Sequence, residues 1–587
     1  MEYYRAPLQD QMFALRTFKY QERVASLEKY QDYDIETMQA LLESSADVLT
    51  KETMPLNKIG DKEGVKWDPE TYEVTTATGF KEAYQTLVDN GMMSITGPLE
   101  YGGGGAPETF GSLISEIATA TNKSFTMCSG LTRGLIEALV AHATEEQKQE
   151  YLPKLITGEW SGTMCLTEPQ CGTDLGLITT KAEPQEDGSY KLTGTKIWIT
   201  YGEHDMTSNI IHLVLARLPD APEGIKGIST FVVPKFIDGE RNQVYCSGLE
   251  HKMGIHASPT CVIELEGATG YLFGEPNKGM RSMFTMMNVA RLHVGFEGIA
   301  LSEISYQTAL AFAKDRKQSR ALDSSKSDPN APADNILVHA DVRRMLLNIK
   351  ATNEGMRALA TFVSIEHDVS VYHPDEKVRE EAEDMVALLT PIVKAFFSER
   401  GFLNISEAMQ VCGGAGYTAD WNIEQYLRDE RIAMIYEGTN HIQGLDLVGR
   451  KLPMHGGRLM QNFANRVTTL IRENKEDENM APFIGPLKNA SKVLTGVTME
   501  LAGQAMEDRE VAGAVATNYL RLFGLVAIGF ALTHQARYAL DNPSPQSSTK
   551  LKTVKWYMDV ILPEMDSLVK VIAASKSNMF EFDVEEF

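Results

Sequence analysis

The chain lacks several features that would place it in common functional classes. Basic residues are in deficit, since 56 Lys and Arg stand against 80 Asp and Glu and leave a net charge of −24. Such a charge disfavours binding to nucleic acid or to an anionic membrane, although a few local arginines can still hold a phosphate-bearing ligand. The six cysteines include no CxxC pair. With no secretory leader in residues 1–14, we expect reduced thiols in a cytoplasmic protein.

Other signatures are missing as well. No apolar run approaches the roughly 20 residues that a membrane helix needs, so we expect no membrane span. No β–α–β alternation with a glycine-rich turn is present, which argues against a Rossmann dinucleotide site. We also predict no metal site. The 587 residues, 43% of them hydrophobic, are more than one ordinary core can use and predict a globular protein of several domains.

The pattern of apolar residues predicts a mainly α fold with a central β-domain. Apolar residues recur at helical spacing on both sides of a region of short, β-branched or alternating segments. That region predicts a small antiparallel β-domain, and the first residues, polar and aromatic without periodicity, predict a loosely organised arm. The expected parts are the arm 1–34, a helical domain 35–160, the β-domain 161–278, a helical bundle 279–455 and an extra helical domain 456–587.

Within these parts the elements can be predicted more closely. Strands are expected at 190–200, 210–217, 227–234 and 260–266. Helices are expected at 280–318, 336–366, 375–411, 422–434 and in the block 458–575. The stretch 319–335 contains two prolines and several serines, so it predicts a loop inserted between two helices.

One carboxylate stands between an apolar run and a Gly-Thr-Asn turn. Glu437 follows the segment 431–436 and precedes a leucine- and valine-rich stretch. Burial among apolar groups would raise the pKa of this carboxyl toward the range in which a general base works. The alternative is a solvated residue or a helix cap, which is the commoner role of a Glu before a helix.

Five short motifs occur in one order along residues 35–450. They are TEEQKQEYLPKLITGE at 144–159, GTMCLTEPQCGTDL at 162–175, KIWIT at 196–200, QVCGGAGY at 410–417 and YEGT at 436–439. Together they resemble the acyl-CoA dehydrogenase family. The resemblance implies an N-terminal helical domain, a β-barrel-like middle domain and a C-terminal four-helix bundle. The length, the insert and the block after 455 resemble a larger subgroup, which contains 3-methylmercaptopropionyl-CoA dehydrogenases and relatives acting on straight-chain acyl-CoAs.

The resemblance implies an FAD site with contributions from the β-domain. Thr167 and the main chain of Cys165 and Leu166 would meet the pyrimidine edge of the flavin. Trp198 would cover the flavin ring and Thr200 would lie near its N5 atom. The alternatives are a core aromatic for Trp198 and a helix cap for Thr167.

The helical bundle would supply the other cofactor contacts. The resemblance implies that Arg316 meets the pyrophosphate, and that Thr439 and His441 also touch FAD. Gln410, Gly413 and Gly414 match a turn that meets the cofactor, where glycine permits close approach. The alternatives are a surface ion pair for Arg316, an ordinary turn for the glycines and a solvated His441. In the family a second subunit completes this site, so we expect at least a homodimer.

Substrate contacts follow from the same resemblance. Thr173 matches a family Ser near the pantetheine and phosphate region. Asn288 and Arg291 match an Asp-x-x-Arg pair that contacts CoA, with Asn in place of Asp, and Gly438 belongs to the substrate site. Arg450 is offset by one position from a family arginine and is not assigned.

The implied reaction is α,β-dehydrogenation of an acyl-CoA thioester to a trans-2-enoyl-CoA. Glu437 would take the α-proton, its main-chain N–H and a flavin hydroxyl would bind the thioester carbonyl, and FAD would accept the hydride. Electrons would pass to an electron-transferring flavoprotein.

Three other functions stay open at this point. They are an oxidase of the same architecture that uses O₂, a non-catalytic FAD-binding relative, and a helical scaffold that carries the motifs by chance. Acyl chain length is not predicted, because one methylene changes preference by only about 1–3 kcal/mol.

Overall fold

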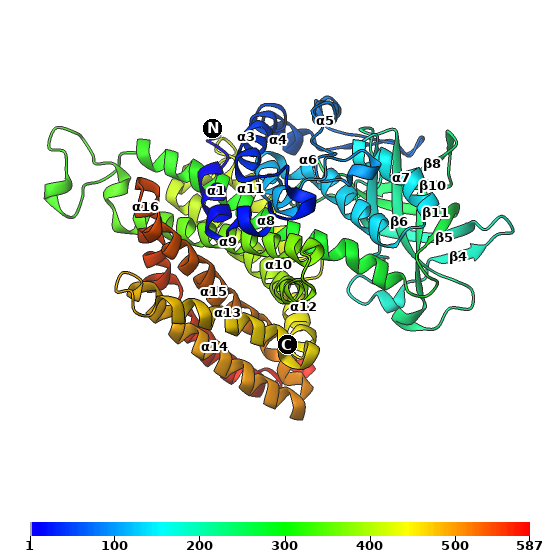
Figure 1. Ribbon diagram of the computed structural model, residues 1–587. Coiled ribbons are helices and arrows are strands. Elements are labelled where there is room, and N and C mark those ends of the chain that lie inside the picture. Colours follow the sequence, from blue (N-terminus) through cyan, green and yellow to red (C-terminus); the bar gives the residue numbers. More distant parts are fainter. Residues whose placement is uncertain (1–2) are drawn as a thin grey trace. The chain divides into compact units, whose positions relative to one another are not determined.

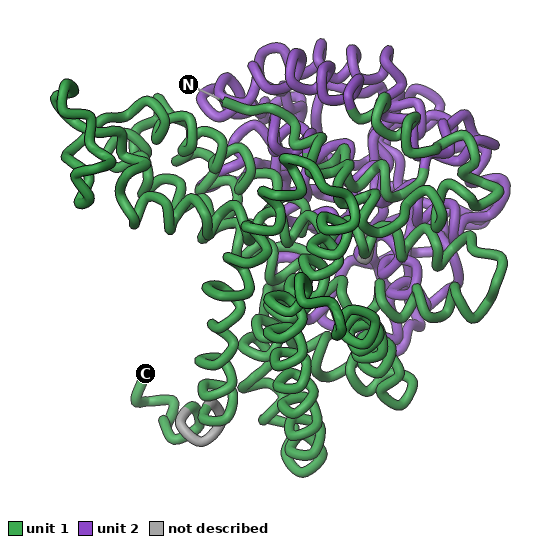
Figure 2. Tube along the Cα trace, turned by 60° about the vertical axis from the view of Figure 1, so that its left-hand side comes forward, with its two compact units in different colours: residues 1–42, 107–116, 294–587 green, residues 43–106, 117–293 purple. Residues whose placement is uncertain are grey.

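The computed structural model describes residues 3–587, without the side chains of residues 288, 289 and 575–578. The chain divides into two compact units, coloured separately in Figure 2. Unit 1 comprises residues 1–42, 107–116 and 294–587, and unit 2 comprises residues 43–106 and 117–293. The fold is mainly helical with one principal sheet, as the sequence predicts. The five domain boundaries proposed from the sequence stay predictions.

Unit 2 is built on a seven-stranded sheet (Figure 1). Its strand order is β10-β11-β5-β4-β6-β3, and β7 pairs with both β11 and β6. Every residue of β7 is buried, and only the last residue of β6 is not, because the β-branched and leucine side chains of both strands point into packed layers. The strands are β3 (Trp160–Cys165), β4 (Lys181–Pro184), β5 (Tyr190–Thr200), β6 (Asn209–Arg217), β7 (Ile228–Pro234), β10 (Val244–Leu249) and β11 (Thr260–Phe273).

The four strands predicted from the sequence are all present, but the sheet is not wholly antiparallel. β3 runs parallel to β6 along its whole length, with Trp160 opposite Asn209 and Cys165 opposite Val214. The prediction of an antiparallel domain is therefore wrong for this pair. Alternating apolar residues identify a strand but carry no information on its direction. Strand β11 also runs seven residues beyond its predicted end at Glu266.

Helices and short hairpins complete unit 2. Two small hairpins, β1 (Lys66–Trp67) with β2 (Val74–Thr75) and β8 (Phe236–Ile237) with β9 (Glu240–Arg241), were not predicted. The helices that lie in this unit, wholly or in part, are α3 (Ile35–Glu52), α4 (Met54–Glu63), α5 (Phe80–Asp89), α6 (Glu108–His142), α7 (Glu145–Thr157) and α8 (Gly279–Asp315). The predicted helix and turn before β3 is confirmed as α7, which begins with a capping box at Thr144 and Gln147.

Unit 1 is almost entirely helical. In addition to parts of α3, α6 and α8, it contains a series of helices that Figure 1 shows from blue to red along the chain. They are α1 (Leu8–Thr17), α2 (Tyr20–Arg23), α9 (Ala340–Tyr372), α10 (Glu376–Cys412), α11 (Ile423–Arg431), α12 (Asn440–Asp446), α13 (Arg458–Asn474), α14 (Ala481–Glu507), α15 (Arg509–Asp541), α16 (Pro545–Trp556) and α17 (Glu564–Met579). The predicted helices are thus confirmed, and the block after 457 contains five of them.

Helices α8 and α10 cross at backbone contact. A methyl group added at Gly298 would lie 2.3 Å from the carbonyl oxygen of Phe397, and one at Gly401 would lie 2.6 Å from the main chain of Gly298. A methyl group at Gly295 would lie 2.4 Å from the side chain of Val393. Only glycine fits such an approach, so this stretch of α10 has a fixed position in unit 1.

The insert 319–335 is a loop between α8 and α9, as predicted. It is closed on itself by Asp334, whose carboxylate accepts hydrogen bonds from the Ser327 hydroxyl at 2.6 Å and from the main-chain N–H groups of Ala321 and Asp328. These hydrogen bonds, with Ser327 first, hold the pKa of Asp334 well below its ordinary value. The loop therefore has its own internal structure although it contains no long helix.

Helix α15 contains a long apolar stretch. An 18-residue stretch within it is apolar enough to cross a membrane, so the expectation that no such run exists is wrong. Of that stretch, 83% is buried inside the structure, as in the central helix of a helical bundle. Helix α15 packs against α9, α14 and α17, which cover most of this stretch.

The N-terminal segment is not the loosely organised arm that the sequence predicts. Helix α1 buries six of its ten residues, and the ring of Phe13 lies 5.1 Å from that of Tyr538 in an edge-to-face contact. Phe18 likewise packs on Phe362 of α9 at 5.3 Å. The correction has a physical reason: ten residues are too few to show helical periodicity when both polar and apolar side chains are buried.

Arg357 of α9 binds three carboxylates inside unit 1. Its guanidinium donates to Glu116 of α6 at 2.6 Å, to Glu303 of α8 at 2.8 Å and to Asp10 of α1 at 2.6 Å. Asp10 also pairs with Lys550 of α16. Burial raises the pKa of Asp10, but Lys550 and Arg357 outweigh it and lower the pKa to about 2. One buried arginine therefore joins four helices that are distant in sequence.

Arg357→Met should destabilise unit 1 strongly, because it leaves buried carboxylates without their cation. Removing one partner of a buried ion pair typically costs about 3–5 kcal/mol. Arg344→Met is the control on the same helix: Arg344 is partly exposed, binds Asp341 and Glu407, and should cost less than about 1 kcal/mol. Denaturant unfolding and tryptic cleavage at Arg16 measure both effects. Equal effects of the two substitutions would contradict the role given to Arg357.

Candidate active site

The loop that follows β3 is fastened to β5 by a buried ion pair. Lys196, 0% exposed, donates from Nζ to Glu168 Oε1 at 2.8 Å and to the carbonyl oxygen of Leu166 at 3.1 Å. Glu168 also accepts hydrogen bonds from the main-chain N–H and hydroxyl groups of Thr179 and Thr180. Burial raises the pKa of Glu168, but Lys196 and these hydrogen bonds lower it to about 2. The carboxylate is ionised and holds the loop in place.

Trp198 lies at a β-bulge in β5. The register against β11 gives β5 an extra residue between Lys196 and Ile199, and Trp198 has φ +63° with its side chain 55% exposed. A bulge turns a side chain away from the face that regular alternation would give it. The neighbouring Ile197 N–H donates to the carbonyl oxygen of Thr167 at 2.9 Å. Trp198 is thus no core aromatic, Thr167 caps no helix, and the residue before Trp198 is hydrogen-bonded to Thr167.

The other predicted residues of unit 2 differ in exposure. Cys165 is fully buried, and burial raises the pKa of its thiol to about 11, so only its main chain could meet a ligand. Thr173 is exposed on the loop after β3, and Thr200 is half-buried at the end of β5. Arg291 is buried in α8. The side chain of Asn288 lies outside the described residues.

In unit 1, Glu437 lies in the turn that precedes α12. Glu437 has φ +57° and Gly438 has φ +82°, so two consecutive residues adopt the left-handed region. That region is disfavoured for a residue with a Cβ. Helix α12 is capped by Thr439, whose hydroxyl accepts from the N–H of Ile442 at 3.3 Å. Glu437 is therefore not the helix cap that the sequence left open, and its side chain is half-buried.

Side chains from α10 and α12 bind the main chain of this turn. Gln443, which is fully buried, donates from Nε2 to the carbonyl oxygen of Glu437 at 2.9 Å. Lys394 of α10 donates from Nζ to the carbonyl oxygen of Gly438 at 2.7 Å and to Asn440 Oδ1 at 3.1 Å. Two buried side chains therefore hold the main chain directly after the Glu437 side chain.

Helix α12 also contacts α15. His441 is exposed and its Nδ1 lies 3.1 Å from the hydroxyl of Thr517. A methyl group at Gly444 would lie 2.9 Å from the main chain of Ala516, so the two helices approach at this glycine. The predicted contact of His441 with a cofactor stays a prediction.

The remaining predicted residues of unit 1 lie at the ends of α8 and α10. Gln410 and the pair Gly413 and Gly414 are exposed, and a methyl group at either glycine would meet no atom within 4 Å. Arg316 is exposed and donates to Gln318 Oε1 at 3.4 Å. Among residues 3–587 no carboxylate lies within ion-pair distance of Arg316, so the surface ion pair is not formed.

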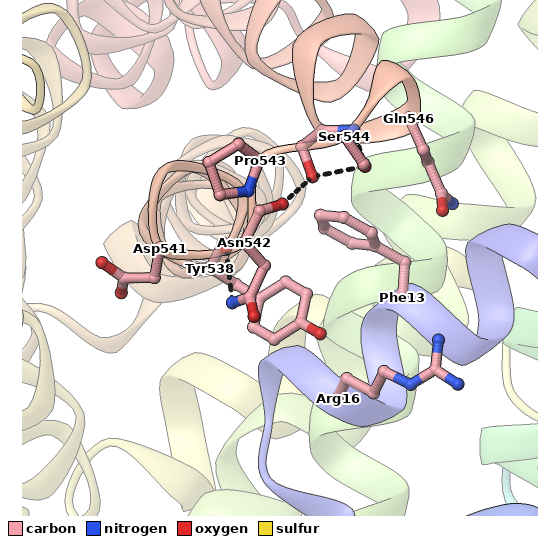
Figure 3. A pocket seen from close by; sticks show the side chains of 9 residues that line it. Phe13, Arg16, Tyr538, Asp541, Asn542, Pro543, Ser544 and Gln546 are labelled. Atoms are coloured by element: carbon pink, nitrogen blue, oxygen red, sulfur yellow. Dashed lines mark hydrogen bonds between the residues drawn. The ribbon is translucent and has the colours of Figure 1, made fainter.

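A separate pocket of about 480 Å³ opens between α1 and the turn from α15 to α16 (Figure 3). Its mouth is polar, and Ser544, which caps α16, accepts a hydrogen bond from the N–H of Ser547 at 3.0 Å. The lining residues are Phe13, Arg16, Tyr538, Asp541, Asn542, Pro543, Ser544, Gln546 and Ser547. None of the predicted site residues is among them, so this pocket is not part of the candidate active site.

Four family models match consecutive parts of the chain. They are the acyl-CoA dehydrogenase N-terminal domain (residues 36–159), its middle domain (163–268), its C-terminal domain (277–452) and an acetyl-CoA dehydrogenase C-terminal like domain (460–583). The 3-methylmercaptopropionyl-CoA dehydrogenase of Ruegeria pomeroyi is 42% identical over 573 residues, which cover 96% of each chain.

Two further proteins are similar over nearly the whole chain. A butyryl-CoA dehydrogenase of Syntrophomonas wolfei is 31% identical over 615 residues, with 100% of this chain and 99% of that one covered. A solved acyl-CoA dehydrogenase complexed with FAD from Bacillus anthracis has a TM-score of 0.75 at 22% identity, covering 93% of this chain and 89% of that one, and shares the fold.

The chain belongs to the acyl-CoA dehydrogenase family. The family assignment from the five motifs is confirmed, as is the similarity to the 3-methylmercaptopropionyl-CoA dehydrogenases. Enzymes of this family use FAD, and this protein is an FAD-dependent acyl-CoA dehydrogenase.

The residues that this acyl-CoA dehydrogenase offers to FAD have suitable chemistry. Trp198 presents an exposed aromatic face, and the backbone at Gly413 and Gly414 is open to close approach. Arg316 carries a guanidinium that no described carboxylate neutralises, which suits a pyrophosphate. Trp198 lies in unit 2 and the others in unit 1. Their individual contacts with FAD stay predictions.

The motifs did not reveal the residues that support the acyl-CoA dehydrogenase site. Lys196 and Glu168 both stand inside quoted motifs, yet neither was assigned a role. Lys394 and Gln443 were not considered. A usable signal exists for Lys394, because it is a lone charge in the otherwise apolar or neutral run 385–397 of a long helix. Such a lysine needs a buried acceptor.

The buried Glu168 predicts a pH dependence of stability. Its pKa is about 2 in the folded protein against an ordinary 4.5, so its contribution is complete above pH 4.5 and is lost as the pH falls toward 2. The melting temperature of the wild-type holoenzyme should be higher than that of Glu168→Gln at pH 7. This difference in melting temperature should become smaller below pH 4.5. The control Glu183→Gln changes an exposed glutamate on β4 and should have the same melting temperature as the wild type at pH 7. A difference in melting temperature between wild type and Glu168→Gln that grows as the pH falls would contradict the stabilising role of the ionised Glu168.

Proposed function

We propose that Glu437 is the base of this acyl-CoA dehydrogenase and that its substrate is 3-methylmercaptopropionyl-CoA or a straight-chain acyl-CoA of similar length. The observation that supports the base is the turn itself. A glutamate occupies a disfavoured left-handed conformation, its main chain is bound by Gln443, and its side chain keeps partial access to solvent. Disfavoured backbone conformations concentrate at functional sites, where surrounding structure maintains them.

The chemistry requires a base and hydrogen-bond donors at fixed positions. Glu437 would take the proton from the α-carbon of the thioester, and its main-chain N–H would donate to the thioester carbonyl oxygen, where negative charge develops. When bound, FAD supplies the hydride acceptor, which no amino-acid side chain can provide. Thr173, Asn288, Arg291 and Gly438 are proposed substrate contacts, and Arg291 is the one that carries a positive charge for the CoA phosphates.

Sequence similarity supports the acyl group. The Ruegeria pomeroyi relative, named for 3-methylmercaptopropionyl-CoA, shares 42% of residues with this chain, and the Syntrophomonas wolfei relative, named for butyryl-CoA, shares 31%. Both named acyl groups are short. A thioether and a methylene differ little in size, so a pocket that accepts one is expected to accept the other.

We further propose a cytoplasmic homodimer that passes its electrons to an electron-transferring flavoprotein. Support for a second subunit comes from the segment that carries Gly413 and Gly414. Tyr417, three residues after Gly414, is 80% exposed, and Leu403, ten residues before Gly413 on α10, is 46% exposed. Large exposed apolar side chains close to an expected cofactor contact are typical of a surface that another subunit covers.

Glu437→Gln should remove the base and keep the shape of the site. The rate of flavin reduction by an acyl-CoA under anaerobic conditions should fall by about 10²–10⁴-fold, the usual contribution of a general base. The FAD content and the spectral change on binding a CoA ligand should be retained. Glu424→Gln, at a glutamate on α11 paired with Arg428, is the control and should reduce flavin at the wild-type rate. Wild-type turnover by Glu437→Gln would overturn the assignment.

A panel of acyl-CoAs tests the substrate. Flavin bleaching without oxygen should be fastest with 3-methylmercaptopropionyl-CoA and with its carbon-only match in length, pentanoyl-CoA, and should decline toward palmitoyl-CoA. Release of peroxide from the reduced enzyme in air should be slow, since the proposed acceptor is a protein. Fast bleaching by palmitoyl-CoA alone would reject the short acyl group, and rapid peroxide release would favour an oxidase.

A further inference from the structure

Lys394 lies where α8 and α10 approach at backbone contact. It lies on α10 between Val393 and Phe397, the two residues that meet the glycines of α8 at backbone contact, and it is 0% exposed. A group attached to such a crossing cannot follow the movements of a surface turn. A hydrogen bond from Lys394 therefore fixes its acceptor relative to the helical bundle.

The acceptors of Lys394 lie directly after Glu437. Its ammonium donates to the carbonyl oxygen of Gly438 at 2.7 Å and to Asn440 Oδ1 at 3.1 Å. Asn440 in turn donates from Nδ2 to the carbonyl oxygen of Ala395 at 3.1 Å, so both ends of its amide bind α10. Hydrogen bonds from a charged donor are roughly twice as strong as those between neutral groups.

Lys394 thereby holds the main chain directly after Glu437, a residue with a disfavoured backbone conformation. The carbonyl of Gly438 can reach Lys394 with Glu437 at φ +57° and Gly438 at φ +82°. On the other side, the hydroxyl of Tyr436 donates to Glu297 of α8. The residues that flank Glu437 are thus bound to the two helices that cross at Gly298.

We propose that Lys394 is a positioning residue, which keeps the Glu437 carboxylate in the orientation needed for proton removal. This inference rests on the proposed role of Glu437. Without the ammonium, Gly438 would lose its donor and Asn440 Oδ1 would keep that of the Ser398 hydroxyl at 3.3 Å. The turn could then relax to a conformation without the left-handed Glu437. The carboxylate would then be displaced from its reacting position, although the fold and the FAD contacts on other elements would remain.

The test measures the limiting rate of flavin reduction in single-turnover experiments on FAD-loaded enzyme, with pentanoyl-CoA as the probe. Lys394→Met should lower this rate about 10- to 100-fold, the scale of the loss expected from a displaced reacting group. The half-saturating substrate concentration should change much less than the rate, because the proposed contacts Thr173, Asn288 and Arg291 lie on other elements. The absorbance spectrum of bound flavin should be unchanged.

Lys550→Met is the matched control. Lys550 is another buried lysine of unit 1, 3% exposed, but it binds Asp10 and Glu354 instead of the turn. The same substitution there should lower the melting temperature and leave the reduction rate of the folded enzyme unchanged. An equal loss of rate in Lys550→Met would show that Lys394 acts only through general stability, and would overturn the proposal.

The double variant Glu437→Gln with Lys394→Met separates the possible failures. If Lys394 acts through Glu437, the double variant should reduce flavin as slowly as Glu437→Gln alone. A further loss equal to that of Lys394→Met would show independent action and overturn the proposal, as would a wild-type rate in Lys394→Met. A wild-type rate in Glu437→Gln would reject the base itself and the inference with it.

Discussion

A main-chain carbonyl held by a buried lysine fixes a loop in each unit. In unit 2, Lys196 donates to the carbonyl oxygen of Leu166, and two residues farther along β5 the backbone turns left-handed at Trp198. In unit 1, Lys394 donates to the carbonyl oxygen of Gly438, and the preceding Glu437 is left-handed. The left-handed conformation costs about 1–2 kcal/mol for a residue with a Cβ. Buried charge-assisted hydrogen bonds are strong enough to offset it.

The two buried lysines have different hydrogen-bond acceptors for their ammonium groups. Lys196 has an ionised carboxylate, Glu168, within 2.8 Å, and burial lowers the pKa of this lysine while that carboxylate raises it. Lys394 binds the neutral oxygens of a carbonyl and an amide. Removing the acceptors of either lysine would leave a charge in a low-dielectric interior, which is strongly unfavourable. Each lysine and its loop therefore depend on one another.

The sequence predicts which helices and strands form in this fold better than it predicts how the strands pair. Periodicity identified the long helices and four strands, and the motif YEGT identified Glu437, because these signals are local. Periodicity could not show that β3 runs parallel to β6, since the direction of a strand depends on the path of the chain between the two strands. Nor could it show that Trp198 is exposed: strict alternation along β5 would predict a regular strand, and the bulge arises from pairing with β11.

Charge networks between distant segments were equally out of reach. Nothing in the sequence around Asp10, Glu116 or Glu303 indicates a partner for these carboxylates. The fold brings all three to the guanidinium of Arg357. An ion pair over hundreds of residues leaves no spacing pattern in a single sequence, whereas a helix leaves one every three or four residues.

The helical block after residue 457 bears directly on the proposed base. Helix α12 begins three residues after Glu437 and lies between α10, which binds Asn440, and α15, which meets it at Gly444 and at His441. Helix α15 is in turn tied to α10 by Arg521, whose Nε and Nη2 donate to the two carboxylate oxygens of Glu399. Because α15 buries 19 of its 33 residues, it cannot shift without disturbing its own core. The additional helices therefore contact α12 as well, and a short helix that would be only marginally stable by itself has a second neighbour besides α10.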